Sequence, residues 1–122
     1  MKIRDRVRKS AVDFEELLDR VDRDPQLLRD LVEIFLSDYL LRLSALRLAI
    51  AEADWKTTEK VSHTLKGMLS NMAAARAASA AAHLELLARA VDTAALPDAL
   101  ASLEGEVAQL VAELNVYLAK KV

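Results

Sequence analysis

Apolar residues recur every three or four positions along almost the whole of this chain. That spacing places them on one face of an α-helix, because a helix completes a turn about every 3.6 residues. The chain of 122 residues holds only two glycines and two prolines, and 53% of its residues are hydrophobic while 4% are aromatic. Since residues that interrupt helices are so rare, the sequence predicts an all-α fold.

Capping residues and prolines divide this repeat into separate helices. Asp13, Asp24 and Asp54 are typical N-cap residues, and Pro25 and Pro97 suit the first turn of a helix. We expect helices over residues 14–22, 25–51, 55–72, 73–91 and 97–119. The last four are long, amphipathic and joined by connections of a few residues. This organisation predicts an antiparallel up-down four-helix bundle with the short extra N-terminal helix as a lid.

The apolar stripe of each long helix predicts its buried face. In chain order the stripes are Leu28, Leu31, Phe35, Leu43, Leu46 and Ile50; Val61, Leu65, Met68, Leu69 and Met72; Ala77, Ala80, Leu84, Leu87 and Val91; and Leu100, Leu103, Val107, Leu110, Leu114 and Tyr117. We expect one domain over residues 13–119, a basic tail or linker over residues 1–12, and a short tail over residues 120–122.

The charge and the remaining composition exclude several classes of function. With 17 basic and 19 acidic residues the net charge is −2, so the chain has no general attraction for nucleic acid or anionic lipid. The absence of cysteine excludes disulfides and thiolate metal sites. No apolar run approaches the roughly 20 residues of a membrane span, and the first ten residues lack the apolar segment of a signal peptide. We therefore expect a cytoplasmic protein that binds neither nucleic acid nor membrane.

The stretch HTLKG, residues 63–67, places a glycine inside a good helix, where it costs about 1 kcal/mol relative to alanine. When the third helix is rotated at about 100° per residue, His63 falls opposite the buried stripe and points to solvent. Gly67 lies one turn beyond His63, and Ser70 lies two turns beyond it. Since residues four apart stack on a helix surface, a larger residue at position 67 would stand against the imidazole. The glycine therefore uncovers the ring for something bulky.

HTLKG resembles the signature of histidine phosphotransfer (HPt) domains, the helical bundles that carry phosphoryl groups in two-component phosphorelays. Further likenesses are the segment DPQLLRDLVEIFLSDY, the positions of Asn71 and Ala74 where the family often has N-x-G-A, and the pair Leu84-Glu85 where it has LE. The resemblance covers residues 13–119. It implies that His63 accepts the phosphoryl group.

The resemblance also implies roles for the neighbours of His63. Lys66 would be the cation that flanks the phosphate, and Gly67 would be the residue that gives steric clearance. The sequence departs from the family pattern at Met68 and Leu69, where small or hydroxyl residues are common, and at Ala73, where a glycine is usual. Lys56, Lys60, Ser70 and Asn71 are candidate polar or partner contacts, although Lys56 and Lys60 also fit an ordinary solvated helix face.

The chain itself offers no catalytic apparatus that the sequence reveals. It has no glycine-rich phosphate cradle, and two histidines without cysteine cannot form a zinc site unaided. We expect no metal and no cofactor on this chain, and no enzyme activity of its own. The resemblance implies that a response-regulator receiver domain supplies the acidic pocket, the Mg²⁺ and the aspartate, and that a sensor or hybrid histidine kinase is the other partner. We expect a monomer.

Two other functions remain open from the sequence. The bundle could be a degenerate relative that acts only as an adaptor or dimerisation module, or an enzyme with His63 as a general base. The enzyme is disfavoured because a convex helix face is expected to provide neither a substrate pocket nor a group that orients the imidazole.

His83 serves as the comparison for His63. Leucines follow His83 at the third and fourth positions, so we expect a structural or surface histidine. Gly105 is expected to mark a packing contact or a bend.

Overall fold

The structure is a computed structural model that describes residues 10–120. Within this range the chain forms five helices and no strand: α2 (Phe14–Arg20), α3 (Pro25–Ala51), α4 (Trp55–Asn71), α5 (Ala75–Ala90) and α6 (Leu96–Ala119). The all-α prediction is confirmed. Each long helix begins and ends within about two residues of its expected position.

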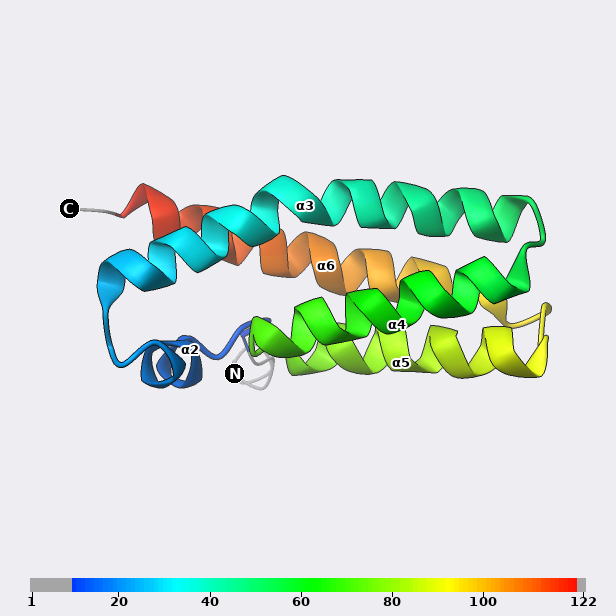
Figure 1. The fold of residues 1–122 in the computed structure, drawn as a ribbon, viewed down its shortest axis with the longest axis horizontal. Coiled ribbons are helices and arrows are strands. Elements are labelled where there is room, and N and C mark those ends of the chain that lie inside the picture. Colours follow the sequence, from blue (N-terminus) through cyan, green and yellow to red (C-terminus); the bar gives the residue numbers. More distant parts are fainter. Residues whose placement is uncertain (1–9, 121–122) are drawn as a thin grey trace, which may run out of the picture.

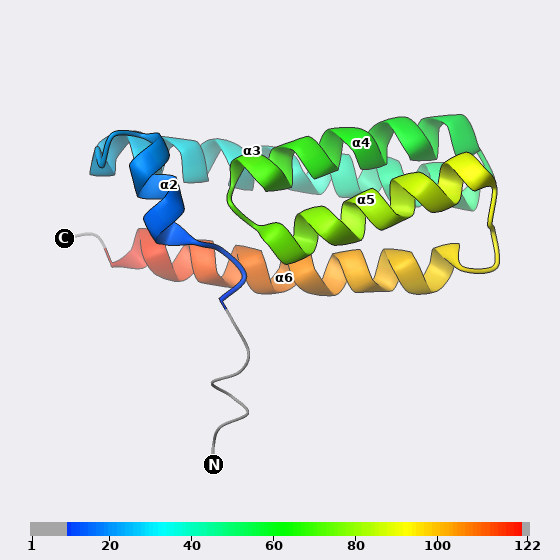
Figure 2. The same ribbon diagram turned by 90° about the horizontal axis from the view of Figure 1, so that it is seen from below.

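The four long helices run alternately up and down and close into a bundle (Figure 1). α3 packs against α4 and α6, and α5 packs against the same two helices, so each helix has two neighbours around the core. The short helix α2 lies across one end of the bundle, near the start of α3 and the end of α6 (Figure 2). The expected antiparallel four-helix bundle with a short extra N-terminal helix is therefore confirmed.

Three aspartates begin the helices as the sequence predicts. The carboxylate of Asp13 accepts a hydrogen bond from the backbone N–H of Glu16, and Asp24 accepts from two backbone N–H groups of the first turn of α3. Asp54 accepts from the N–H of Thr57 at 3.1 Å. Each cap satisfies backbone donors that have no partner within the helix and so stabilises its first turn.

Residues in the left-handed conformation follow four of the helices: Asp22 and Arg23 after α2, Ala53 after α3, Ala73 after α4 and Val91 at the end of α5. α2 ends two residues earlier than expected, because Asp22 and Arg23 adopt φ values of 54° and 57° that turn the chain away from the helix. After α4, Ala73 has a φ of 53°. This conformation favours glycine, which the resemblance leads one to expect at that position, so Ala73 keeps the geometry of the turn at a conformational cost of about 1 kcal/mol.

The core follows the expected stripes of α3, α4 and α6, whose residues are buried or half-buried. The expected stripe of α5 is partly wrong: its buried residues are Ala77, Ala81, Leu84, Glu85 and Ala88, and Val91 is exposed at the end of the helix. A run of alanines gives little directional signal, because alanine is compatible with either face of a helix. The small residues lie against the neighbouring helices, and the buried face also includes a glutamate.

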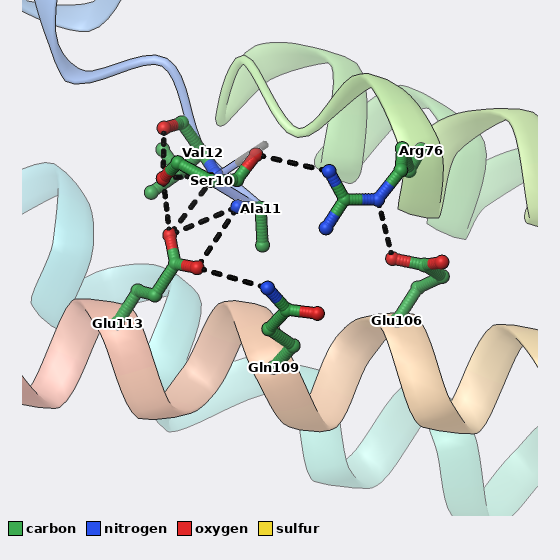
Figure 3. Close-up of polar contacts among 7 residues, drawn as sticks. All are labelled: Ser10, Ala11, Val12, Arg76, Glu106, Gln109 and Glu113. Carbon is green, nitrogen blue, oxygen red and sulfur yellow. Dashed lines mark hydrogen bonds and ion pairs between the residues drawn. The ribbon is translucent and has the colours of Figure 1, made fainter. Parts of the chain in front are cut away.

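Residues just before α2 are bound to the bundle by polar contacts (Figure 3). The carboxylate of Glu113 on α6 accepts hydrogen bonds from the backbone N–H groups of Ala11 and Val12 and from the hydroxyl of Ser10. Arg76 on α5 donates to the carbonyl of Ser10 at 3.1 Å. Ala11 and Val12 are buried. The packed part of the chain therefore begins at least two residues before the expected domain boundary at residue 13. Residues 1–9 of the expected N-terminal tail and residues 121–122 of the expected C-terminal tail lie outside the described part.

The Glu113 contacts predict how stability depends on pH. Burial raises the pKa of Glu113, but hydrogen bonds from Ser10, the backbone and Gln109 outweigh burial and lower the pKa below its usual value. The stabilisation is therefore present above the ordinary carboxyl pKa of about 4.3 and is lost as the pH falls through the lower pKa of the folded state. We expect Glu113→Gln to reduce the free energy of unfolding by about 1–2 kcal/mol at pH 7.

Denaturant unfolding measured from pH 7 down to acid checks this prediction. The difference between Glu113→Gln and the original chain should shrink as the pH falls, while Glu52→Gln, at an exposed glutamate, should change little at any pH. A Glu113→Gln difference that stayed constant with pH would contradict a role for the charged carboxylate.

Candidate functional site

His63 lies in the middle of α4, on the face opposite its buried residues. Leu65, Leu69 and Met72 are buried, whereas the side chain of His63 is 67% exposed. The rotation predicted from the apolar stripe is therefore confirmed. His83 on α5 is also exposed, in agreement with a surface histidine.

A glutamate on the neighbouring helix orients the imidazole of His63. Nδ1 of His63 lies 3.0 Å from Oε2 of Glu85, which belongs to α5 and is 7% exposed. A carboxylate accepts hydrogen bonds, so this contact requires the proton on Nδ1 when the ring is neutral. Nε2 then carries the lone pair. The expectation that nothing orients this ring is wrong, because the sequence did not show that α5 brings Glu85 to His63.

The same carboxylate binds two cationic side chains. Nζ of Lys66 lies 3.0 Å from Oε1 of Glu85, and Arg89 of α5 contacts Oε2 at 3.1 Å. Arg89 also donates to Glu59 of α4 at 2.8 Å. A buried carboxylate is costly unless it is paired and hydrogen-bonded. These contacts meet that requirement and join α4 to α5 beside His63.

The contacts decide the ionisation of Glu85. Burial alone raises its pKa, but hydrogen bonds from Lys66 and His63, together with their charges, outweigh burial and lower the pKa. Glu85 therefore carries a negative charge in the folded protein near neutral pH. In this state Lys66 is already paired with a carboxylate, which the sequence did not indicate.

Gly67 has no packing role in α4. A Cβ placed on Gly67 would meet no atom within 4 Å, and the same is true of Gly105 on α6. The expected packing contact at Gly105 is therefore not present. At position 67 we expected any residue larger than glycine to stand against the imidazole, and this is wrong for alanine. Its Cβ would meet no atom within 4 Å, so only a longer side chain could stand over the ring.

The other candidate residues surround His63 at different distances along α4. Lys56 and Lys60 are exposed. Ser70 and Asn71 are exposed at the end of the helix, where their backbone carbonyls accept hydrogen bonds from Arg20 of α2 at 2.9 and 3.0 Å. α2 thus fixes the end of the helix that carries His63.

A shallow groove between α3 and α4 lies at this end of the helix. Ile34 and Phe35 of α3 and Met68 and Asn71 of α4 are among its lining residues. Met68, one of the departures from the family pattern, is half-buried and packs against the core. Asn71 is therefore part of an apolar surface that borders the polar face around His63.

Glu85 contacts both His63 and Lys66, and the sequence does not single it out as a site residue. In the sequence the pair Leu84-Glu85 is only a family likeness, and the apolar stripe expected for this helix does not include position 85. A signal was present: Lys66 is three residues after His63, so a single carboxylate on an adjacent helix can reach both side chains.

The described residues hold neither a metal-binding cluster nor a membrane-spanning helix. No group of three or more histidine, cysteine, aspartate or glutamate side chains between residues 10 and 120 could hold a metal ion. In the same range no helix combines the length and the apolar character needed to cross a membrane.

Comparison with known proteins identifies the family. The sequence model of the family described as Hpt domain matches residues 30–113 of this chain. The chain belongs to the Hpt domain family. Its fold resembles the crystal structure of histidine-containing phosphotransfer protein B (HptB) from Pseudomonas aeruginosa PAO1, with a TM-score of 0.85 and 23% sequence identity over 92% of this chain and 97% of that one. No curated protein sequence matches the chain.

Family membership gives the general role. Hpt domains are phosphocarriers of phosphorelays rather than enzymes, and their partners are receiver domains and histidine kinases. This role agrees with an exposed histidine on a helix surface.

The Glu85 contact predicts the tautomer of the Hpt domain's His63. At alkaline pH, where the imidazole is neutral, ¹⁵N NMR should show His63 mainly protonated at Nδ1. Glu85→Gln removes the negative charge that favours this form, so the Nδ1-protonated population should fall. Glu59→Gln is the matched control: it removes a partner of Arg89 but keeps Glu85, and it should leave the tautomer unchanged. An identical tautomer ratio in Glu85→Gln and the original chain would contradict the orienting role.

Proposed function

We propose that His63 accepts a phosphoryl group on Nε2 and exchanges it with the aspartate of a response-regulator receiver domain. The observation that carries the proposal is the orientation of an exposed ring by Glu85: the hydrogen bond occupies Nδ1, and no residue between 10 and 120 hydrogen-bonds Nε2. Nε2 is therefore available to a molecule outside the bundle.

The transfer needs no base from this chain. The lone pair of Nε2 attacks the phosphorus of the aspartyl phosphate, the new P–N bond forms as the P–O bond to the aspartate breaks, and the carboxylate leaves with the electron pair. No proton has to be removed from Nε2, because Glu85 holds the ring proton on Nδ1. Return of the group to an aspartate reverses the same step.

The lysines supply charge near the transferred group. Lys66 lies beside His63 through their common partner Glu85, and an ammonium there balances part of the phosphate charge. Lys56 and Lys60 are exposed on the same helix and act through longer-range attraction. Mg²⁺ and the acidic pocket come from the receiver domain, which leaves this chain with the acceptor and its electrostatic surroundings.

The carrier is favoured over an adaptor that has lost phosphotransfer. An adaptor needs a surface but no acceptor chemistry, and it has no use for a costly buried glutamate aimed at an exposed imidazole. The Glu85 contacts with both His63 and Lys66 therefore support the carrier. For a general-base enzyme, Glu85 supplies the group that orients the imidazole. The side chain of His63 is nevertheless 67% exposed, so the site does not exclude water or position a substrate.

The receiver domain would dock over the face of α4 that carries His63, Gly67 and Ser70. The groove that contains Met68 and Asn71 gives this face an apolar border, and the lysines give orientation. Such a contact is transient, so we expect a total buried area of about 1,200 Å² or less.

The acceptor assignment predicts that His63 is the phosphorylated residue. Incubation with a phosphorylated receiver domain should give acid-labile, alkali-stable labelling, which His63→Gln should abolish and His83→Gln should leave intact. His83→Gln, at an exposed residue, should change the free energy of unfolding by no more than about 0.5 kcal/mol. His63→Gln loses a hydrogen bond to Glu85 and should cost about 1 kcal/mol, which leaves the bundle folded. Labelling that survives His63→Gln would remove the assignment.

The docking face predicts where a receiver domain perturbs the NMR spectrum. Chemical shifts should change along α4 from His63 to Asn71 and at Ile34 of α3, and these changes should weaken as salt screens the lysines. A contact mapped mainly to α6 would contradict this docking.

The open position of Gly67 predicts that stability and transfer move in opposite directions. Gly67→Ala should stabilise the fold by up to about 1 kcal/mol, because it raises helix propensity and the added Cβ meets nothing. Gly67→Gln should keep the bundle folded but lower the transfer rate, since a long side chain obstructs the in-line approach and a displacement of about 1 Å can cost on the order of 100-fold. Thermal stability and transfer rate are measured on the same samples.

Gly105 supplies a matched control for this experiment. It is also a helical glycine with open space around its Cβ position, but it lies on α6. Gly105→Ala and Gly105→Gln should stabilise in the same way and leave transfer unchanged. Gly67→Gln that transfers at the original rate would show that the missing side chain has no role in access.

A further inference from the structure

Four large apolar residues are exposed along α3 at intervals of seven. Leu27, Ile34, Leu41 and Leu48 are between 49% and 69% exposed. We refer to these four residues as the α3 stripe. Eight large hydrophobic residues are exposed in the described chain, so half of them lie on this one line. Scattered apolar residues on a surface are ordinary, but an ordered row suggests an interaction surface.

The spacing of the α3 stripe is that of helices that pair along their length. Residues seven apart fall on nearly the same side of a helix, with a drift of about 20° that a shallow left-handed supercoil removes. From Leu27 to Leu48 the row covers about 32 Å at a rise of about 1.5 Å per residue. A partner that covers the whole row must present a straight helix of similar length.

The chain itself provides such a helix. α3 has 27 residues, whereas an average helix in globular proteins has about 10–14. The row is also symmetric about its midpoint: in an antiparallel pair Leu27 faces Leu48 of the other copy, and Ile34 faces Leu41. A second copy of α3 therefore matches the α3 stripe in length and in spacing.

Charges along α3 favour the antiparallel arrangement. Asp30 and Glu33 are exposed in the first half of the helix, which also holds Arg29 and Asp38. Arg42 and Arg47 are exposed in the second half, where Arg42 pairs with Asp38 and Arg47 pairs with Glu104 of α6. Antiparallel pairing brings the acidic half of one helix beside the basic half of the other. Parallel pairing would instead bring like charges together, which is unfavourable.

Small residues beside the row allow the helices to approach. Ser37, Ser44 and Ala45 are exposed between the larger side chains. Side chains of this size leave room for a leucine or isoleucine from a facing helix, as in the packing of ridges into grooves. The face therefore has both the projections and the spaces that a helix pair needs.

We propose that two copies of this chain pair through the α3 stripe as a weak antiparallel, two-fold symmetric dimer. One face contributes to both sides of such an interface, as two-fold symmetry requires. The contact involves a single helix face, which is smaller than the interfaces of permanent dimers, so association is concentration-dependent. Under this proposal the chain is a monomer at low concentration and a dimer at high concentration. The dimer does not rest on the proposed phosphotransfer, because neither its surface nor its test uses His63.

Sedimentation equilibrium on the full chain tests the association. Up to about 1 mM the chain should show a reversible monomer–dimer equilibrium. Leu41→Asp should weaken the association at least about tenfold, because it places a charge in the centre of the apolar face. Leu86→Asp, at a leucine of α5 that is 58% exposed, should leave it unchanged. A chain that stays monomeric at 1 mM, or equal losses in both variants, would overturn the proposal.

Single cysteines test the antiparallel arrangement, and the chain has no cysteine to interfere. Ser37 lies next to the midpoint of the α3 stripe, so two copies of Ser37→Cys should form a disulfide-linked dimer under mild oxidation. Leu27→Cys should not link to itself, because antiparallel helices hold these positions far apart. Ser102→Cys, exposed on α6, is the control for random collision. Efficient linkage of Leu27→Cys, or linkage of Ser37→Cys no faster than that of Ser102→Cys, would overturn the arrangement.

Discussion

Glu85 is held between α4 and α5 with Oε2 beside His63 and Arg89 and Oε1 beside Lys66. The geometry of the exposed imidazole of His63 depends on this one buried carboxylate. A charged group in such a position is stable only when its partners are supplied together, so α4 must present His63 and Lys66 on the side that faces α5. The alanines of α5 make this possible, because small side chains let the two helices approach closely enough for hydrogen bonds between them. The alanine-rich segment, which carries little directional signal in the sequence, thus permits the contact between Glu85 and His63.

His63, the acceptor that we propose, lies on the outer face of a well-packed helix. The proposed role requires an imidazole that is open to another protein and has a fixed orientation. Burial on the far side of α4 fixes the helix through Leu65 and Leu69, while Arg20 of α2 holds the carbonyls at its end. Gly67 gives up helix propensity at a position where no contact requires a glycine. Stability is therefore supplied by the core and the caps, and the surface around His63 is left available for binding.

Much of the bundle could be predicted from the sequence, because capping aspartates and apolar stripes are local signals with a direct physical cause. The exposed position of His63 followed from the same periodicity. The Glu85 contact could not be predicted in this way, since it joins residues 22 positions apart through the packing of two helices. The buried face of α5 was partly misassigned for a related reason: alanine does not distinguish core from surface, so Ala81 and Ala88 carried no directional signal. The left-handed Ala73 was hidden because its residue type does not reveal its φ angle.

Ile34 belongs to two surfaces, and this overlap connects the two proposals. It lines the groove beside Met68 and Asn71 that borders the docking face, and it is also a member of the α3 stripe. A side chain buried in a helix pair cannot at the same time contact a receiver domain. The two contacts are therefore mutually exclusive at Ile34. A high concentration of this chain favours the helix pair, and a high concentration of receiver domain favours the complex. His63 itself lies outside the stripe, so pairing would limit access of a partner to the groove without changing the chemistry of the imidazole.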